Sequence, residues 1–212
     1  MNNSLLQPQA ASFEIAGGPA DILTETPCHV DLDLEASRRD GRRILLAASA
    51  ILQQGEALLN TIPVEPYGRR IPVAFNASVG GHYRHCLDHF ASLLRDMDSG
   101  TVNYDRRERD PRLESDPVFA LATTQLLRGR LEDLDPARLS IPLQARCEVS
   151  YTAGDAPASA STVGRELVYA IAHAIHHYAL IGFMARLVEV PLPDHFGVAP
   201  STVAHLASGA AK

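Results

Sequence analysis

The chain has 212 residues, of which 46% are apolar, and 25 acidic against 19 basic residues give a net charge of -6. This length fits one domain with a sizeable core, and the acidic balance offers no basic surface for a phosphate backbone, which argues against nucleic acid as a partner. Cys28, Cys86 and Cys147 lack CxxC spacing, so neither a disulfide framework nor a thiolate zinc site is indicated. The composition therefore favours a folded protein that acts on a small molecule.

The first residues contain neither a basic leader nor a long apolar run, and no stretch of about 18 consecutive apolar residues occurs, as a membrane span requires. We therefore expect a cytoplasmic protein that is not held in a membrane. Residues 1–30 are rich in Gln, Ala, Gly and Pro without a sustained period, which predicts a loose N-terminal extension. A domain over residues 31–195 and a C-terminal tail over residues 196–212 are expected to follow.

Apolar residues at spacings of three and four predict four long helices. They cover roughly residues 37–59, 78–97, 117–135 and 162–190. Good N-cap residues support three of the starts: Ser78, Asp116 before Pro117, and Ser161 or Thr162. The fourth helix is expected to be the longest and to end before two prolines. The proline-rich residues 60–73 predict an extended connection between the first two helices.

Between Leu143 and Tyr151 apolar and polar residues alternate, which is the period of a half-buried strand. Because one strand is not stable alone, it is expected to pair in a hairpin or with an extended segment near residues 29–32. The predicted fold is all-α: a four-helix bundle with a small β ribbon in the connection between the third and fourth helices. The tail can pack over one end of the bundle, with Ser201 or Thr202 starting a last short turn.

Six of the nine histidines fall in two clusters on the second and fourth predicted helices. The clusters are His82, His85 and His89, and His173, His176 and His177. Residues four apart on a helix have Cβ atoms about 5–6 Å apart, so His173 and His177 can both ligate one ion, with a third imidazole from the second helix. The two clusters therefore predict a metal site between facing helices.

Three protein ligands would leave coordination positions open, so the ion could bind water and lower its pKa, bind a thiolate, or polarise a carbonyl. Zinc and nickel are favoured as the divalent ion, and iron and manganese stay candidates, because imidazole ligation selects weakly among them. Two other readings stay open. The chain can be a non-catalytic metal-binding bundle, or a metal-free helical interaction protein whose histidines are core and surface polar groups.

Other residues give weaker signals. Cys86 follows His85 directly and can be a nucleophile or a ligand, although a buried cysteine is more often inert. The charged segment with Tyr104, Arg107 and Arg109 can bind an anionic group, but a solvated loop explains it equally well. The sequence lacks the motifs of zinc peptidases, Walker phosphate-binding loops, GxSxG hydrolases and di-iron bundles, so these classes of protein are not indicated.

The sequences SVGGHYRHCLDHF and HAIHHYALIG resemble those of the DinB-like family, damage-inducible four-helix proteins that include thiol-dependent transferases. The resemblance covers about residues 37–190. It implies a four-helix bundle in an up-down-down-up order, a divalent metal held by His85, His173 and His177, and a homodimer. His82, His89 and His176 are additional to this pattern. Together with Tyr104, Arg107 and Arg109 they are candidates for residues beside the metal or in the substrate pocket, and His176 can also be a surface group.

The chain carries Tyr-Ala-Leu after His177 where many members of the family carry Arg-Gly-Gln, so no particular transferase activity follows from the resemblance. The expected function is that of a cytoplasmic metal-dependent enzyme, a transferase or a hydrolase. Its ion would activate a thiol or water against a small electrophilic substrate. The expected partners are that small molecule and, for a transferase, a low-molecular-weight thiol.

Overall fold

The computed structural model describes residues 29–152 and 155–209, with the backbone alone for residues 29–33. The predicted N-terminal extension lies outside this part of the chain, except for its last two residues. The described chain is mostly helical with a small sheet, as predicted. Its α-helices are α1 (His29–Leu59), α2 (Val64–Gly68), α3 (Val79–Asp96), α4 (Arg112–Ser115), α5 (Pro117–Glu132), α6 (Val163–Leu187) and α7 (Pro200–Gly209). Its 3-10 helices are η1 (Pro72–Ala74), η2 (Met97–Ser99) and η3 (Pro136–Ser140), and its strands are β1 (Thr101–Asn103), β2 (Pro142–Arg146) and β3 (Ala158–Thr162).

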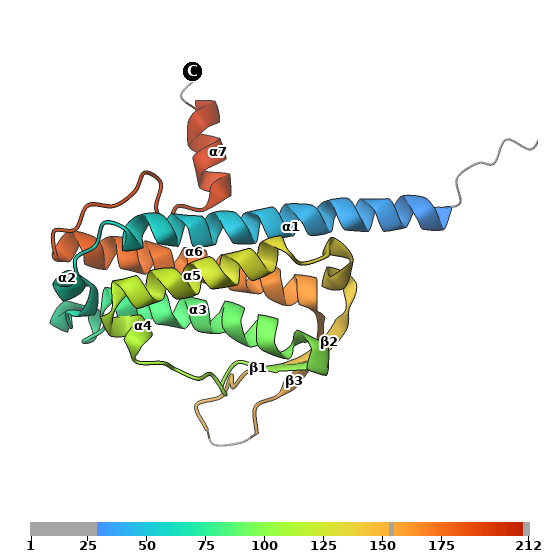
Figure 1. Cartoon of the computed structure of the whole chain (residues 1–212), viewed down its shortest axis with the longest axis horizontal. Coiled ribbons are helices and arrows are strands. Elements are labelled where there is room, and N and C mark those ends of the chain that lie inside the picture. The colour runs from blue at the N-terminus through green and yellow to red at the C-terminus, as the bar shows by residue number, and fades with distance from the viewer. Residues whose placement is uncertain (1–28, 153–154, 210–212) are drawn as a thin grey trace, which may run out of the picture.

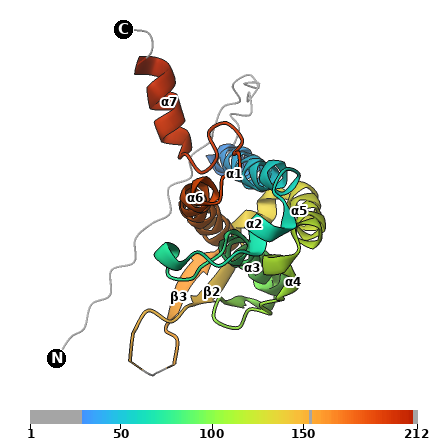
Figure 2. The same cartoon turned by 90° about the vertical axis from the view of Figure 1, so that its left-hand side faces the viewer.

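The four long helices α1, α3, α5 and α6 lie side by side around the core (Figure 1). Helix α1 packs along α5 and α6, and α3 packs along α6 and α5. In Figure 1, α1 and α6 run toward the left, whereas α3 and α5 run toward the right. The end-on view in Figure 2 shows the four helices grouped around a common centre. The contact between α3 and α6 brings the two helices that carry the histidine clusters together.

A tyrosine pair joins the four helices at one level of the core. Tyr83 of α3 and Tyr178 of α6 are fully buried, and their rings stack with centroids 5.9 Å apart. The hydroxyl of Tyr83 lies 2.9 Å from Oγ1 of Thr124 on α5. On α1 the facing residue is Gly55, where a Cβ atom would lie 2.3 Å from both tyrosine hydroxyl oxygens. The pair therefore requires α1 to approach closely through a glycine.

Two of the predicted helix starts are confirmed by their caps. The Ser78 side chain accepts a hydrogen bond from the Gly81 N–H, and the Asp116 carboxylate accepts from the N–H groups of Val118 and Phe119. For α6 the cap is Thr162, the second of the two candidates, whose hydroxyl accepts from the Arg165 N–H. These side chains satisfy backbone donors that have no partner in the first helical turn.

The connection over residues 60–73 was expected to be extended, and this prediction is wrong, because α2 and η1 lie in it. Pro66 falls in the first turn of α2, where a missing N–H costs no intrahelical hydrogen bond. Tyr67 is fully buried and donates a 2.5 Å hydrogen bond from its hydroxyl to the Leu113 carbonyl. A buried tyrosine therefore anchors a short helix despite the prolines.

The predicted ribbon is a three-stranded sheet in the order β1-β2-β3. Strand β2 pairs antiparallel with β3, as the hairpin alternative predicts, and parallel with β1. Residues 29–32 belong to α1, so the alternative pairing partner is wrong. The strand also ends at Arg146 and not at Tyr151, because the Glu148 N–H turns away to the Asp105 carboxylate at 2.8 Å.

The C-terminal part agrees with the prediction at Phe196, which packs on the core, but differs from it in α6 and α7. Helix α6 ends at Leu187, and with 25 residues it is shorter than α1 with 31. Phe196 is buried and stacks on Tyr178 with ring centroids 4.7 Å apart. Helix α7, by contrast, has no buried residue and projects away from the other helices (Figure 1), so the tail covers the core only up to its first residues.

By length and composition alone, α6 is the one helix in the described ranges that could cross a membrane. It carries three histidines and the buried Glu166, and it packs against α1 and α3. Packing on several sides makes a helix apolar on several faces. The composition of α6 is therefore that of a core helix.

Gly55→Ala is expected to lower the free energy of unfolding by about 1–3 kcal/mol, because the new methyl group overlaps two buried tyrosine hydroxyls. Gly129→Ala in α5 is the matched control. No heavy atom lies within 4 Å of its Cβ position, so it is expected to be neutral or to stabilise by up to about 1 kcal/mol. Urea unfolding of both variants measures the difference. Equal effects would contradict the close approach of α1.

Candidate metal centre

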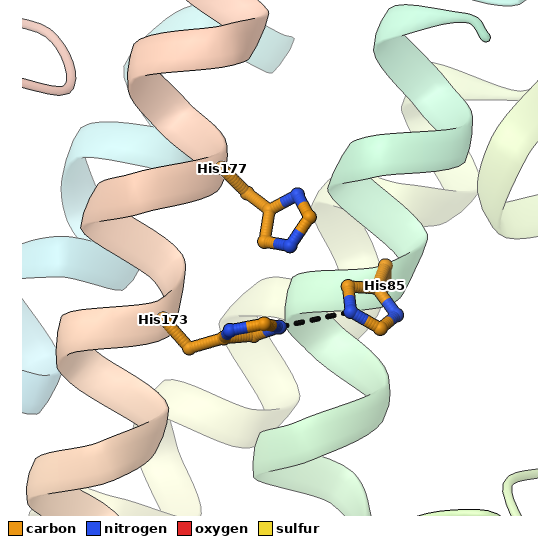
Figure 3. Close-up of side chains that lie close together, drawn as sticks. All are labelled: His85, His173 and His177. Atoms are coloured by element: carbon orange, nitrogen blue, oxygen red, sulfur yellow. Dashed lines mark hydrogen bonds between the residues drawn. The ribbon is translucent and has the colours of Figure 1, made fainter. Parts of the chain in front are cut away.

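The two histidine clusters meet where α3 faces α6. Nε2 of His85 lies 2.8 Å from Nε2 of His173. His177 lies one turn further along α6, and Figure 3 shows the three rings turned toward one another. One ring nitrogen from each of His85, His173 and His177 lies within 4.8 Å of the others. The structure thus brings together the three imidazoles that the resemblance implied as ligands.

Burial keeps these imidazoles neutral. Desolvation is the main cause that lowers the pKa of His85 and His177 to about 3, and neighbouring histidines lower it further. Desolvation also lowers the pKa of His173. Neutral imidazole is the form that binds a metal ion, and three such donors from two rigid helices fit a divalent ion. The three imidazoles can therefore bind a metal ion at neutral pH without first losing a proton.

The three additional histidines have different surroundings. Nδ1 of His82 lies 2.8 Å from Nδ1 of His177, which leaves the Nε2 atom of His177 directed toward the other two rings (Figure 3). His89 is buried, with its ring centroid 4.4 Å from that of His173. His176 is exposed, and its ring lies edge-on to His177 at 5.3 Å. His82 therefore contacts the predicted ligand His177, and His89 packs against the predicted ligand His173. His176 lies at the exposed edge of the cluster.

The charged loop after β1 reaches the site through one arginine. Nη1 of Arg107 lies 2.6 Å from Nδ1 of His85 and 3.4 Å from Nε2 of His89. Tyr104 is buried with its ring 4.9 Å from that of His89, but its hydroxyl donates to Glu166 at 2.9 Å and so points away from the histidines. Within the described ranges, Arg109 makes no hydrogen bond or ion pair with a histidine.

Two residues beside the cluster were not foreseen from the sequence. Tyr169 stacks on His173 with ring centroids 5.5 Å apart, and the buried Glu166 accepts hydrogen bonds from Tyr104 and from Ser161, the latter at 2.6 Å. Tyr169 precedes His173 by four residues on one helix, and this spacing in the sequence could have indicated that the two side chains are neighbours. Both residues support the α6 side of the cluster.

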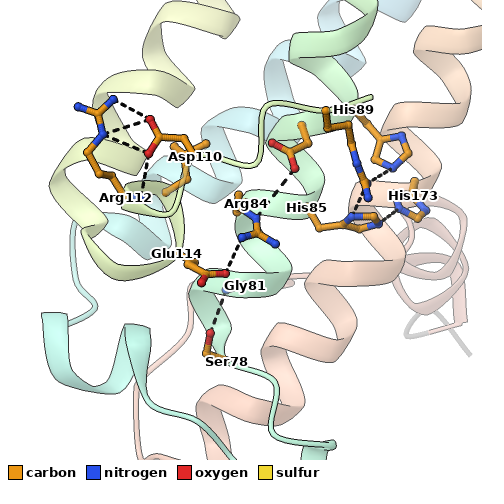
Figure 4. A network of polar contacts seen from close by, with 12 residues as sticks. Ser78, Gly81, Arg84, His85, His89, Asp110, Arg112, Glu114 and His173 are labelled. Carbon is orange, nitrogen blue, oxygen red and sulfur yellow. Dashed lines mark hydrogen bonds and ion pairs between the residues drawn. The ribbon is translucent and has the colours of Figure 1, made fainter. Parts of the chain in front are cut away.

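A pocket of about 310 Å³ opens onto the cluster at His82, His85 and His177. Its remaining wall includes Arg70, Arg84 and Glu114. Arg84 donates to Glu114 at 2.7 Å, as Figure 4 shows, and this pair fixes the charged side of the pocket. A small molecule can approach His85 and His177 from here.

Cys86 lies at the back of α3 and not in the pocket. Its side chain is 1% exposed, and burial raises the pKa of its thiol well above the ordinary range. A cysteine that stays a thiol is neither a ready nucleophile nor a metal ligand. The packing role is therefore the one that the structure supports for this residue.

The contact between Arg107 and His85 sets the position of a proton. A guanidinium only donates hydrogen bonds, so Nδ1 of His85 must accept, and the neutral ring then carries its proton on Nε2, the atom that faces His173. Ligation through Nε2 would need that lone pair free and the proton on Nδ1, opposite a donor. Arg107 in this position therefore opposes ligation by His85.

Arg107→Ala is expected to bind zinc more tightly than the wild type, by about tenfold, because one charge-assisted hydrogen bond no longer competes for His85. Arg106→Ala, which removes an exposed neighbour in the same loop, is expected to leave the affinity unchanged. Competition with a chromogenic chelator measures both. Equal or weaker zinc binding in Arg107→Ala would show that Arg107 supports the site and does not oppose ligation.

Acid is expected to destabilise the metal-free protein. An unfolded histidine has a pKa of about 6.5, whereas burial lowers the pKa of His85, His89 and His177 to about 3. Between these values the unfolded chain binds more protons than the folded one, so the free energy of unfolding falls as the pH falls below about 6.5. Urea midpoints from about pH 7 to about pH 5 should show this.

His89→Phe is expected to make that dependence shallower, because it removes one buried imidazole. His205→Ala, which removes an exposed histidine of α7, should leave the slope unchanged. A urea midpoint that stays constant over the same pH range in the wild type would contradict the burial of neutral histidines.

Comparison with known proteins agrees with this geometry. The family model of the DinB superfamily matches residues 50–181, which include all three histidines of the cluster. The chain is also 33% identical over 114 residues to a protein of Rhizopus delemar named FK506-binding protein 5. That alignment covers 52% of the chain and 30% of the fungal protein, so the chain spans under a third of its length. No solved structure matches the chain significantly. Because the family model covers more than half of the sequence, the chain belongs to the DinB superfamily.

Proposed function

We propose that this protein is a cytoplasmic metal-dependent enzyme, a transferase or a hydrolase, that activates a thiol or water against a small electrophilic substrate. The observation that carries the proposal is the set of three neutral imidazoles, His85, His173 and His177, whose nitrogens lie within 4.8 Å of one another beside an open pocket. A closed structural site would need a fourth protein ligand. The described residues group only these three.

Zinc or nickel is the favoured ion, with iron and manganese as alternatives. When bound, a divalent ion supplies Lewis acidity, which lowers the pKa of a coordinated water or thiol and polarises a carbonyl. The chain's own residues then have separate tasks. His82 holds the Nδ1 side of His177, which fixes the direction of its Nε2 lone pair. Arg70 and Arg84 line the entrance and can orient a polar substrate.

The fold that we propose around this site is a four-helix bundle in an up-down-down-up order. The directions of α1, α3, α5 and α6 in Figure 1 support this order. We also propose that the protein is a homodimer. Exposed apolar side chains on the outer faces of α1 and α6 support this proposal. They include Leu46, Val168 and Phe183, with exposed fractions of 70%, 44% and 61%.

The proposal is tested first by metal content. Untagged protein, purified without chelator and reloaded with zinc or nickel, is expected to hold about one ion per chain by elemental analysis. The variants His85→Ala, His173→Ala and His177→Ala are each expected to lose at least about tenfold in affinity. His205→Ala, an exposed histidine of α7, should bind like the wild type. Full occupancy in the three variants would rule out this ligand set.

Activity is tested next, with the loaded protein and panels of thiol-transfer and hydrolysis substrates. Turnover that the wild type shows and His177→Ala lacks would support the enzyme. Metal binding without turnover on either panel would favour the alternative, a non-catalytic or stress-associated metal-binding bundle. A chain that takes up none of the four metals would favour a metal-free interaction protein.

A further inference from the structure

A second and larger cavity, of about 450 Å³, lies away from the histidine pocket. Its walls come from α3, from α5 and from the charged segment that leads into α4. No histidine lines it, but Arg107, which contacts His85, lies in its wall, so the cavity adjoins the candidate metal centre. Its volume is in the range of pockets that bind small molecules.

Two polar side chains of α3 line this cavity without a hydrogen-bond partner in the described chain. Ser92 is 1% exposed, and its Oγ atom has no partner. Asp88 is 7% exposed and forms an ion pair with Nε of Arg84 at 4.0 Å, but this distance is too long for a hydrogen bond. Buried polar groups are nearly always hydrogen-bonded, so a carboxylate and a hydroxyl that line one cavity without a hydrogen bond indicate groups that a ligand completes.

The cavity also has positive groups without carboxylate partners. Arg107 and Arg130 both line it, and neither has a carboxylate oxygen within 4.0 Å among the described residues. Arg130 donates only to the Leu94 carbonyl, at 2.7 Å. By contrast, Arg112 in the same wall is paired with Asp110 at 2.6 Å. The cavity thus presents a carboxylate that accepts no hydrogen bond and two guanidiniums that have no carboxylate partner among the described residues, of which Arg107 also donates to His85.

The rest of the wall is apolar. Leu113 and Leu127 are buried, and Phe119 carries the guanidinium of Arg112 over its ring at 4.1 Å. A ligand that filled this space would bury an apolar group there while its polar end met the charged groups.

We propose that this cavity binds a small zwitterion with an apolar side chain, of the size and chemistry of a free α-amino acid. Its ammonium group would lie at Asp88, its carboxylate at Arg107 and Arg130, and its side chain against Leu113, Phe119 and Leu127. A dianion such as a phosphate ester would meet the buried Asp88 carboxylate, and a simple amine would leave the guanidiniums unpaired. The site does not depend on the proposed metal chemistry.

The test uses the full chain freed of metal by a chelator, so that failure of the metal site does not affect it. Calorimetry or NMR titration compares L-phenylalanine with 3-phenylpropanoate, which lacks the ammonium group, and with 2-phenylethylamine, which lacks the carboxylate. L-Phenylalanine is expected to bind at least about tenfold more tightly than either analogue, since each charged group adds a charge-assisted hydrogen bond.

Variants then assign the two ends of the ligand. Asp88→Asn should abolish the preference for L-phenylalanine over 3-phenylpropanoate, and Arg130→Gln should abolish its preference over 2-phenylethylamine. Arg138→Gln is the control, because Arg138 is paired with Asp98 away from the cavity. Circular dichroism checks that each variant is folded. Equal affinity for the three compounds, no binding of any, or a preference that Asp88→Asn and Arg130→Gln leave unchanged in folded protein would overturn the proposal.

Discussion

The close packing of Tyr83 and Tyr178 against Gly55 is the constraint on which the rest of the structure depends. The stacked rings set the distance between α3 and α6, and the glycine allows α1 to cover them. Each tyrosine directly follows a histidine of the cluster, His82 in α3 and His177 in α6. Because neighbouring residues on a helix differ in direction by about 100°, fixing the tyrosines in the core places these histidines beside it, at the same level. The core contact therefore positions the candidate metal centre.

The cluster concentrates polar groups where burial is costly. Desolvation lowers the pKa values of five neighbouring histidines, and a guanidinium from the β1–α4 loop lies against one of them. Apolar side chains at these positions would give the folded protein a higher free energy of unfolding. Such a concentration of desolvated titratable groups next to an open pocket is typical of a functional site. The sheet contributes to this arrangement as well, since β1 pairs with β2 and leads the chain directly to Tyr104 and Arg107.

Much of the fold could be predicted from local sequence. The spacing of apolar residues located the long helices, and Ser78 and Asp116 marked two starts, because caps and helical periodicity depend on nearby residues. The spacing of His173 and His177 likewise placed two imidazoles on one side of α6. Tertiary contacts decided the remainder. Helix α2 depends on the burial of Tyr67 against Leu113, and the contact of Arg107 with His85 depends on the path of a loop.

Anomalous diffraction at the zinc edge, from a crystal of zinc-loaded protein, shows whether His85, His173 and His177 hold one divalent ion. We expect one strong peak per chain, at about 2.0–2.1 Å from one nitrogen of each of the three rings, with Arg107 moved away from His85. A peak at exposed histidines such as His195 or His205 alone, or no ordered peak in fully loaded protein, would contradict this expectation.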